Sequence, residues 1–427
     1  MAEIRPFRAW RYSHSYSKNI DSLTSPLFDV ISKKQREKLY QNPYNSIHIS
    51  VPKGSDPATA AAETLQRWKD EGVLVQDPIP SIYVYYQFFS FPGSKKTRCR
   101  KGFICYIKAY DWDEHILLRH ENTIPHAVND RTELLEKTEL NVSPTHGLYT
   151  DEHHELEAYM DESMRNPIYE TEDYQGVRDV LSVIQDAEVI EKFKNLIASK
   201  QIILADGHHR YESAIEYRKA CMENNSHHTG EEAYNYHMIY LTNTESDDLV
   251  ILPTHRLISR LESFDKEGIL ASIEEHFNVK EVDNPYDIHE IIMGKPWTFG
   301  LVFKDNAYAI RLKSELFPKL NWPFPEVVKQ LDLTVMHYFI IEKALGIPGP
   351  QQRRSKAIGF ERNFSECLNK VYHKEAQLAI ITQEISMEEV KSVCFSGHTM
   401  PQKSTYFYPK AVCGLVFGSI KTSEQNI

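Results

Sequence analysis

One stretch of the chain constrains the fold more than any other, because it joins an expected strand to an expected helix through a dense group of polar side chains. Residues 202–205 form an apolar run typical of a short buried strand, and residues 212–218 begin an amphipathic helix. The residues between them include Asp206, Gly207, His208, His209 and Arg210. A strand that leads directly into a helix is typical of an α/β protein, in which ligands bind beyond the carboxyl ends of the strands.

This turn has the chemistry of an anion-binding site. The first backbone N–H groups of a helix have no partner within it, and the helix dipole favours negative charge there. Arg210 adds a guanidinium that matches phosphate or carboxylate, and the two imidazoles can donate hydrogen bonds or transfer protons. A turn that only capped the helix would need a single short polar residue. We therefore expect Asp206, His208 and His209 to act in catalysis, and Gly207 and Arg210 to bind phosphate.

The rest of the chain predicts a mixed α/β protein, and its 427 residues are enough for two or three domains. Aromatic and β-branched residues at 82–91 and 102–111 predict a long hairpin around the loop 92–96, whereas residues 151–200 are expected to be mostly helical. The expected parts are an N-terminal α+β region at 1–115, a catalytic and anion-binding core at 116–256, and a C-terminal α+β domain at 257–427 that contributes residues 400–410.

A second group of candidate residues follows the apolar run 116–118. Glu121 stands beside His120, and a carboxylate next to an imidazole can serve as a general base or hold a metal ion such as Mg²⁺. Asp130 and Arg131 follow closely and add a second carboxylate and a guanidinium. We expect Glu121 to be catalytic and Arg131 to contact phosphate.

Two further polar groups lie later in the chain. His255 and Arg256 end an expected strand, and the proline-bounded stretch 400–410 concentrates Lys403 and Ser404. Cations and hydroxyls so close together suit a site that binds phosphate or carboxylate. The alternative is that this stretch is a strand whose lysine side chains only face solvent. No G-x-S-x-G motif surrounds Ser404, which argues against a serine nucleophile. Asp332 is expected to cap a helix that runs through His337.

The composition of the chain and the absence of several known motifs argue against some classes of protein. The net charge of −11 argues against general nucleic-acid binding, and no apolar run has the length of a membrane span. The six cysteines form no C-x-x-C pair and the first residues lack a signal peptide, so a reduced cytoplasm is the simplest expectation. Walker, G-x-G-x-x-G, H-E-x-x-H and D-x-D-x-T/V motifs are absent, which argues against P-loop kinases, dinucleotide enzymes and haloacid-type phosphatases.

Several motifs resemble a bacterial and archaeal domain-of-unknown-function family over essentially the whole chain. They comprise residues 205–212, 252–256 and 400–410, together with the N-terminal segments 5–9, 29–32 and 42–45. The family is catalogued both as a phosphoserine-phosphatase homologue and as a transcriptional regulator. At residues 25–29 this chain has Ser-Pro-Leu-Phe-Asp, where the family usually has Pro-Pro-Tyr-Asp.

The pairing of His120-Glu121 with the later turn at 206–210 also resembles the ParB/sulfiredoxin-like fold of free-serine kinases. That resemblance implies a ParB-like core elaborated by extra helices. It also implies that Glu121 activates the substrate hydroxyl while the turn holds nucleotide phosphates. The two motifs are farther apart here than in those kinases, with residues 151–200 between them. The sulfiredoxin cysteine is absent from the motif, so redox repair is not implied.

Together these observations predict a phosphotransfer enzyme of serine metabolism. The leading expectation is a phosphoserine phosphatase with Mg²⁺ as the candidate cofactor. The alternatives are a free-serine kinase that uses a nucleotide, and a non-catalytic regulator that binds a phosphorylated ligand or nucleotide. The expected partner is a small phosphorylated molecule or a nucleotide rather than a nucleic acid or a membrane.

Overall fold

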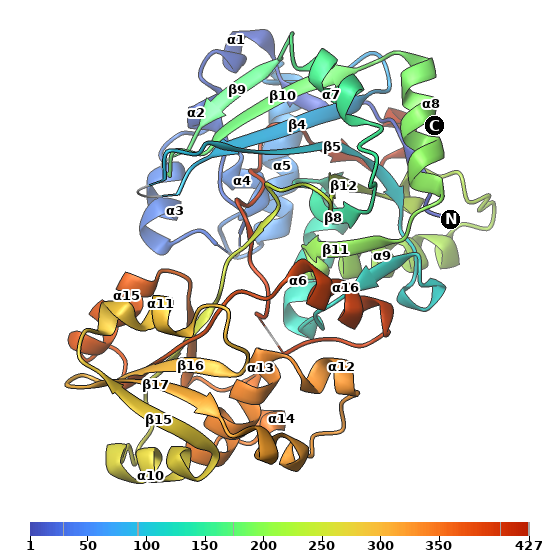
Figure 1. Cartoon of the computed structure of the whole chain (residues 1–427). Helices are drawn as coiled ribbons and strands as arrows, with labels where there is room; N and C mark the ends of the chain where they lie inside the picture. The colour runs from blue at the N-terminus through green and yellow to red at the C-terminus, as the bar shows by residue number, and fades with distance from the viewer. Residues whose placement is uncertain (29, 92–93, 174, 402, 426–427) are drawn as a thin grey trace. The chain divides into compact units, whose positions relative to one another are not determined.

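The chain divides into two units (Figure 1). Each unit has its own hydrophobic cores. The computed structural model describes residues 1–28, 30–91, 94–173, 175–401 and 403–425, so Asp29, Pro92, Gly93 and Gln402 of the motifs and turns above lie outside the described residues. Unit 1 comprises Met1–Arg119, Thr123–Val250 and Pro409–Ile427, and unit 2 comprises His120–Asn122 and Ile251–Tyr408.

Unit 1 is built on a nine-stranded mixed sheet with the order β6-β11-β8-β12-β5-β4-β10-β9, in which β1 also pairs with β5. The strands are β1 (Ile4–Arg5), β4 (Ile82–Phe89), β5 (Arg98–Lys108), β6 (Leu117–Arg119), β8 (Thr145–Tyr149), β9 (Tyr169–Glu172), β10 (Arg178–Ile184), β11 (Ile202–Asp206) and β12 (Tyr236–Asn243). Strand β11 runs parallel to β6 and antiparallel to β8, and β12 runs parallel to β8. The expected hairpin is confirmed as β4 and β5, with Tyr83 opposite Ile104.

Both faces of this sheet are covered, because successive residues of its central strands enter different cores. Tyr83 and Tyr85 of β4 pack with Trp68 of α5 in one core. Ile82 and Val84 pack in the other core, which includes residues of α8. Side chains alternate between the two faces of a strand. The sequence of a strand that is buried on both faces is therefore a continuous apolar run.

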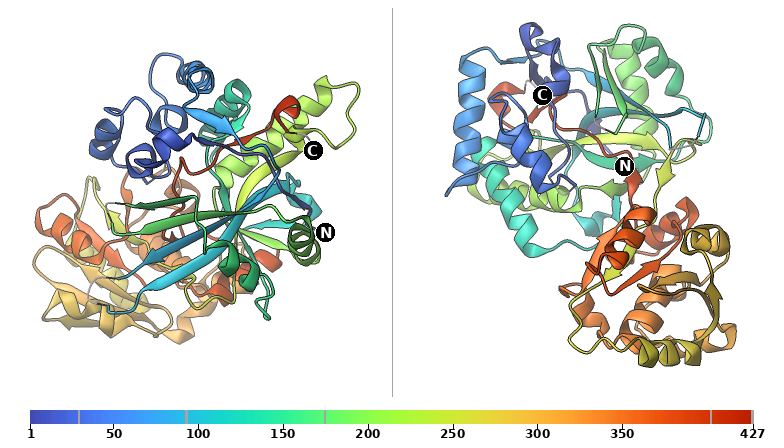
Figure 2. Two further views of the ribbon diagram at one scale, coloured as in Figure 1. Left: turned by 90° about the horizontal axis from the view of Figure 1, so that it is seen from above. Right: turned by 90° about the vertical axis from the view of Figure 1, so that its left-hand side faces the viewer.

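Helices and short strand pairs complete unit 1. The helices are α1 (His14–Ser17), α2 (Ile20–Leu23), α3 (Lys33–Leu39), α4 (Ile47–Ser50), α5 (Pro57–Asp70), α6 (Pro125–Thr138), α7 (Glu157–Ser163), α8 (Ala187–Ala198) and α9 (His208–Asn224), with 3₁₀ turns η1 (Trp112–Glu114), η2 (Ala233–Asn235) and η6 (Thr422–Glu424). The short pairs are β2 (Trp10–Tyr12) with β3 (Leu74–Gln76) and β7 (Leu140–Asn141) with β21 (Gly418–Ser419). The C-terminal segment, red in Figure 2, lies among the blue and green elements of this unit.

The expectation that residues 151–200 are mostly helical is wrong. They contain β9 and β10, which add to the edge of the sheet beside β4. In β9, Tyr169 and Thr171 are buried whereas Glu170 and Glu172 are exposed. This alternation with a period of two indicates a half-buried strand, and the high charge of the segment obscured it.

Unit 2 is an α+β fold on a six-stranded antiparallel sheet with the order β15-β17-β16-β19-β14-β18. Its strands are β14 (His255–Ile258), β15 (Phe277–Val282), β16 (Thr298–Val302), β17 (Ala307–Leu312), β18 (Ile358–Glu361) and β19 (Leu378–Ile381), and the short strands β13 (Val250–Ile251) and β20 (Phe407–Tyr408) pair with each other. Its helices are α10 (Lys266–His276), α11 (Ile288–Ile292), α12 (Glu326–Lys329), α13 (Asp332–Val335), the π-helix η5 (Met336–Ala344), α14 (Gly349–Gln352), α15 (Phe364–Tyr372) and α16 (Met387–Phe395), with 3₁₀ turns η3 (Pro285–Asp287) and η4 (Ser314–Lys319).

The mixed α/β class is confirmed by these two sheets and their helices. The expected regions 1–115 and 116–256 share the sheet of unit 1, and residues 409–427 also belong to that unit. Among the described residues, no helix is both long and apolar enough to cross a membrane.

A row of polar side chains crosses three neighbouring strands inside the sheet of unit 1. Asp179 of β10 lies opposite Gln87 of β4, which lies opposite Arg100 of β5. Asp179 accepts hydrogen bonds from Tyr85 Oη at 2.5 Å and Gln87 Nε2 at 2.8 Å. Gln87 Nε2 also donates to the backbone oxygen of Lys410 at 3.0 Å, and Arg100 donates to that of Pro409. The row therefore holds the C-terminal segment against the sheet.

This row predicts an unusual pH dependence of the stability of unit 1, because burial raises the pKa of Asp179 to about 7. Between the unfolded value near 4 and the folded value, the folded protein keeps a proton that the unfolded chain releases. This carboxyl group therefore makes unit 1 less stable as the pH rises through that window, by about 4 kcal/mol at most. Asp179→Asn should remove this loss of stability, because asparagine does not ionise. Urea denaturation of the wild type and of Asp179→Asn, between about pH 4 and pH 7, measures the free energy of unfolding of each. If that free energy changes equally with pH in both proteins, the prediction is contradicted.

Candidate functional site

The residues singled out in the sequence divide between the two units, so each group is described by itself. Unit 1 contains Arg131, Asp206, Gly207, His208, His209 and Arg210, and unit 2 contains Glu121, His255, Arg256, Lys403 and Ser404.

The strand–turn–helix expected at residues 202–218 is present in unit 1. Strand β11 ends at Asp206, and α9 begins at His208. Gly207 between them has a φ of 90°, which is accessible to glycine and strained for other residues. A Cβ atom at this position would lie 2.7 Å from Thr145 Cγ2 and 2.9 Å from Arg210 Nη2. Glycine is therefore required both by the backbone and by the close approach of the Arg210 side chain.

Asp206 lies in a buried ion cluster with two cations. One carboxylate oxygen accepts from Arg210 Nη2 at 2.9 Å, and the other pairs with the ammonium of Lys410. Burial alone would raise the pKa of Asp206, but Lys410 and Arg210 lower it well below its usual range. Asp206 therefore stays ionised and orients both cations. The three groups carry a net charge of +1, with side chains no more than 13% exposed.

The other groups around the turn are held by the protein itself. Arg210 Nη1 also donates to Ser143 Oγ at 2.8 Å and to the Pro144 carbonyl oxygen at 2.6 Å. His209 Nε2 accepts from the backbone N–H of Ile124 at 3.0 Å, and His208 is buried. Arg131 pairs with Asp130 at 2.6 Å and donates to the Ser50 carbonyl oxygen at 2.8 Å.

Two further histidines of unit 1 are buried beside this cluster. Burial, followed by the charge of Arg100, lowers the pKa of His146 well below its usual value. Burial and the charge of Arg210 lower the pKa of His237 to about 3. Both rings are therefore neutral at pH 7 and can serve as hydrogen-bonding groups rather than cations.

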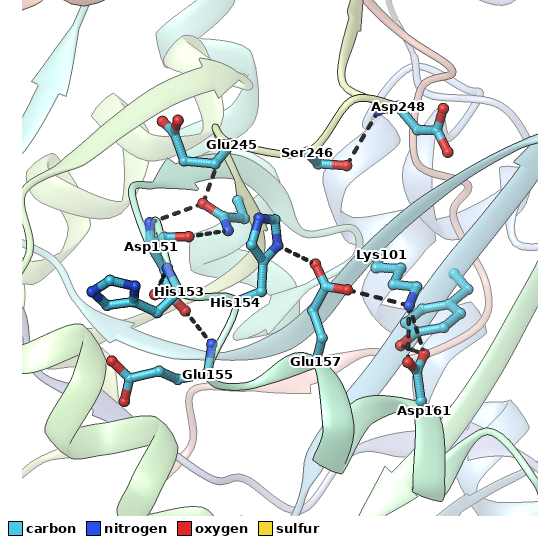
Figure 3. Close-up of polar contacts among 12 residues, drawn as sticks. Lys101, Asp151, His153, His154, Glu155, Glu157, Asp161, Glu245, Ser246 and Asp248 are labelled. Carbon is cyan, nitrogen blue, oxygen red and sulfur yellow. Dashed lines mark hydrogen bonds and ion pairs between the residues drawn. The ribbon is translucent and has the colours of Figure 1, made fainter.

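A separate polar cluster around Asp151, at one end of the sheet of unit 1, holds the backbone of this part of the chain in place (Figure 3). The carboxylate of Asp151 accepts from the backbone N–H groups of His153 at 3.1 Å and Glu155 at 2.8 Å. Asn243 of β12 bonds the backbone of Asp151 at both its N–H and its carbonyl. These contacts fix the segment after β8 onto the end of β12, so we do not assign this cluster a chemical role.

Unit 2 contains a pocket of about 160 Å³ that includes Glu121. Its lining residues are Glu121, Asn122, Trp322, Phe324, His337, Gly349, Gln352, Arg353, Ile358, Phe360, Met400 and Pro401. Arg353 Nη2 donates to the backbone oxygen of Asn122 at 2.8 Å, and the backbone N–H of Met400 donates to His120 O at 2.8 Å. The pocket thus combines one carboxylate and one guanidinium with aromatic and thioether walls.

A fixed polar network contributes to this pocket. Gln352 Nε2 donates to the carbonyl oxygens of His337 at 3.0 Å and Ile347 at 2.9 Å, so its Oε1 atom accepts from His337 Nδ1 at 2.7 Å. His337 Nε2 then accepts from Arg256 Nε at 3.3 Å. Burial lowers the pKa of His337 to about 3, which agrees with this neutral tautomer. The π-helix that carries His337 is uncommon, and such turns are frequent at functional sites.

Arg256 is a fully buried cation of this unit. Burial lowers the pKa of its guanidinium to about 9, and the negative charge of Glu121 acts in the opposite direction. Arg256 also lies over the ring of Phe360, with 4.9 Å between the guanidinium carbon and the ring centroid. The negative charge of Glu121 and the positive charge of the buried Arg256 therefore stabilise each other.

The remaining predicted residues of unit 2 contribute differently. Lys403 accepts from Arg256 Nη2 through its backbone oxygen at 3.4 Å, and the hydroxyl of Ser404 donates to the Pro401 carbonyl oxygen. His255 accepts from the backbone N–H of Thr382 at 3.2 Å, and burial lowers its pKa to about 4. His255 is not among the residues that line the Glu121 pocket. The roles expected for these residues in phosphate binding stay predictions.

The pocket residues Arg353, Gln352 and Trp322 are not among the residues predicted from the sequence, and Asp332 does not cap its helix as expected. Asp332 is the first residue of α13 instead, and its carboxylate accepts from the backbone N–H of Trp297 at 2.7 Å. The polar run 351–354 after Gly-Pro was an available signal for Arg353. Among the described residues, no group of three or more His, Cys, Asp or Glu side chains could hold a metal ion.

Comparison with known proteins identifies the family of the chain. A family model described as "Protein of unknown function (DUF1015)" matches residues 4–334, so the chain belongs to this family. No curated protein matches the chain.

Solved structures show a distant likeness. A conserved hypothetical protein from Pyrococcus furiosus has 10% identity and a TM-score of 0.38, with 74% of this chain and 95% of that one covered. A mutant free serine kinase in complex with AMP has 12% identity and a TM-score of 0.38, with 75% and 92% covered. C-terminally truncated SbnI from Staphylococcus aureus has 12% identity and a TM-score of 0.35, with 74% and 87% covered.

Proposed function

We propose that this member of the DUF1015 family is a phosphotransfer enzyme that phosphorylates a small hydroxy amino acid, with serine as the first candidate. The observation that carries the proposal is the pocket of unit 2, in which Glu121 and Arg353 stand among aromatic side chains. A guanidinium pairs with a carboxylate, and a carboxylate attracts an ammonium group or accepts a hydrogen bond from a hydroxyl. At about 160 Å³ the pocket suits a molecule of the size of serine.

The position of Glu121 favours a free hydroxyl over a phosphate ester as the substrate. A phosphate ester carries a charge of about −1.5 to −2 at pH 7, which a neighbouring carboxylate repels. A hydroxyl can instead donate its proton to Glu121 while its oxygen forms a bond to phosphorus. The bond from phosphorus to the leaving oxygen of the donor breaks in the same step. A kinase therefore fits this pocket better than the phosphatase expected from the sequence.

The turn of unit 1 supports the proposal through its charge. The cluster of Asp206, Arg210 and Lys410 has a net charge of +1, and it lies at the N-terminus of the long helix α9. Positive charge at the N-terminus of a helix suits the binding of phosphate, so within unit 1 this turn is a candidate group for holding a phosphorylated ligand such as a nucleotide. Mg²⁺ stays part of the proposal as the ion that accompanies the nucleotide. Asp206 does not suit such an ion, because both of its carboxylate oxygens are ion-paired.

Arg353→Met should weaken binding of L-serine by about 10–100-fold, because it removes a charged hydrogen bond to the amino acid carboxylate. Isothermal titration calorimetry measures this affinity in the full chain. Arg354→Met is the matched control, since the neighbouring arginine is exposed and does not line the pocket. Equal affinities in the two variants, or no serine binding by the wild type, would contradict the proposal.

A further inference from the structure

One carboxylate of unit 2 holds two residues of the Glu121 pocket without being part of its lining. Glu342 Oε2 accepts from the indole Nε1 of Trp322 at 3.0 Å and from the backbone N–H of Gly349 at 2.7 Å. Trp322 and Gly349 line the pocket, and Glu342 is not among its lining residues. The other oxygen of Glu342 pairs with the ammonium of Lys343 at 3.1 Å. Glu342 therefore ties two walls of the pocket to each other.

The same two walls are packed closely against each other. A Cβ atom at Gly349 would lie 2.8 Å from Trp322 Cζ2, which is too close for the rigid indole to stay in place. The indole also packs edge to face against Phe324 and Tyr338, with ring centroids 5.6 Å and 5.5 Å apart. An indole has a single N–H donor, so its hydrogen bond to Glu342 fixes which edge of the ring points toward this carboxylate.

The π-helix η5 holds both ends of the short helix α14. Glu342 accepts from Gly349, the first residue of α14, and the carbonyl oxygen of His337 accepts from Gln352, the last residue, at 3.0 Å. In an α-helix, residues five positions apart would lie about 140° apart around the axis. The wider turn of a π-helix, with bonds from i to i+5, brings such residues closer to one side. Both ends of the helix that precedes Arg353 are thus fixed by the same element.

We propose that Glu342 is a positioning residue, which holds Trp322 and α14 so that the pocket has its binding shape before serine enters. This role rests on the proposed function, in which Arg353 directly after α14 binds the carboxylate of serine. A site that is already ordered binds more tightly than one that its ligand must order. The role requires an acceptor oxygen at this position rather than a charge, because one amide oxygen can also accept two hydrogen bonds.

Calorimetric titration of the full chain with L-serine tests this role in three variants. Glu342→Met should weaken binding by about 10-fold, because serine must then order both walls itself. Glu342→Gln should keep most of the affinity, because its amide oxygen can still accept from Trp322 and Gly349. Lys343→Met is the matched control, since it removes the exposed ion pair of Glu342 and leaves both bonds of Oε2 in place. It should bind serine as the wild type does.

NMR of the full chain with isotopically labelled tryptophan gives a second measurement, which needs no ligand. The chain has five tryptophans, and the indole resonance that Trp322→Phe removes is that of Trp322. Glu342→Met should shift this resonance and leave that of Trp68, in a core of unit 1, in place. Gly349→Ala should shift the Trp322 resonance and weaken serine binding as well, because the added methyl group displaces the indole. This variant tests the role even where Glu342→Met fails to fold.

The outcomes separate this role from the proposed function. Wild-type affinity for serine in both Glu342→Met and Gly349→Ala would overturn the role and leave the proposed function standing. An unchanged Trp322 resonance in Glu342→Met would also overturn it, as would equal losses of affinity in Glu342→Gln and Glu342→Met. Absence of serine binding by the wild type would contradict the proposed function itself, and with it the role of Glu342.

Discussion

Glu121→Gln is expected to lower the rate of phosphoryl transfer to serine by about 10²–10⁴-fold, the usual contribution of a general base. Glutamine keeps the size of the side chain and an acceptor oxygen, but it cannot take the proton of the attacking hydroxyl. Serine should therefore still bind, because Arg353 and the aromatic walls of the pocket are unchanged. The expected signature is a large fall in kcat with a smaller change in KM.

Steady-state rates with serine and a nucleotide donor measure this effect. Glu375→Gln provides the control, because Glu375 is an exposed glutamate of the same unit outside the pocket. A wild-type rate in Glu121→Gln would remove Glu121 from the chemistry. An equal loss in both variants would point to a general effect on unit 2 rather than to a base in its pocket.

Asp206→Asn is expected to lower the free energy of unfolding of unit 1 by about 3–5 kcal/mol. Asparagine fits the space but carries no charge, so Arg210 and Lys410 would remain buried without their carboxylate. Two buried like charges then repel each other, and their lost hydration is no longer compensated. Urea denaturation followed by circular dichroism measures this loss.

Lys410→Met is the matched comparison, because it leaves one carboxylate and one guanidinium as a balanced pair. It should destabilise unit 1 less than Asp206→Asn does. Adding Lys410→Met to Asp206→Asn should recover part of the stability, because it removes one of the two like charges that repel each other. Additive losses would show that the net charge of the cluster does not govern its stability.

The parts of the fold that could be predicted depend on contacts between near neighbours in the sequence. The turn at 206–210 was predicted because an apolar run, a glycine and an amphipathic helix follow one another directly. The hairpin of β4 and β5 was predicted for the same reason, since its strands are joined by a short loop. In α5, Asp56 caps the backbone N–H of Thr59 ahead of Pro57, as the local sequence indicates.

The parts that could not be predicted depend on contacts between distant residues. Lys410 reaches Asp206 because the row of Asp179, Gln87 and Arg100 holds its backbone against the sheet. The residues next to Asp206 and Lys410 in the sequence give no sign of this contact, because the two residues lie far apart in the chain. Arg353 was missed for the same reason, because its contact with Asn122 joins segments far apart in the chain.

Phosphorus NMR of the full chain with L-serine, Mg²⁺ and ATP or ADP would detect transfer of phosphate to serine. We expect a growing resonance of O-phospho-L-serine that requires both serine and nucleotide and is lost in Glu121→Gln. Release of inorganic phosphate from added O-phospho-L-serine without transfer from a nucleotide would instead show a phosphatase. Binding of serine or nucleotide with no new phosphorus resonance would contradict the enzymatic account and leave a ligand-binding regulator.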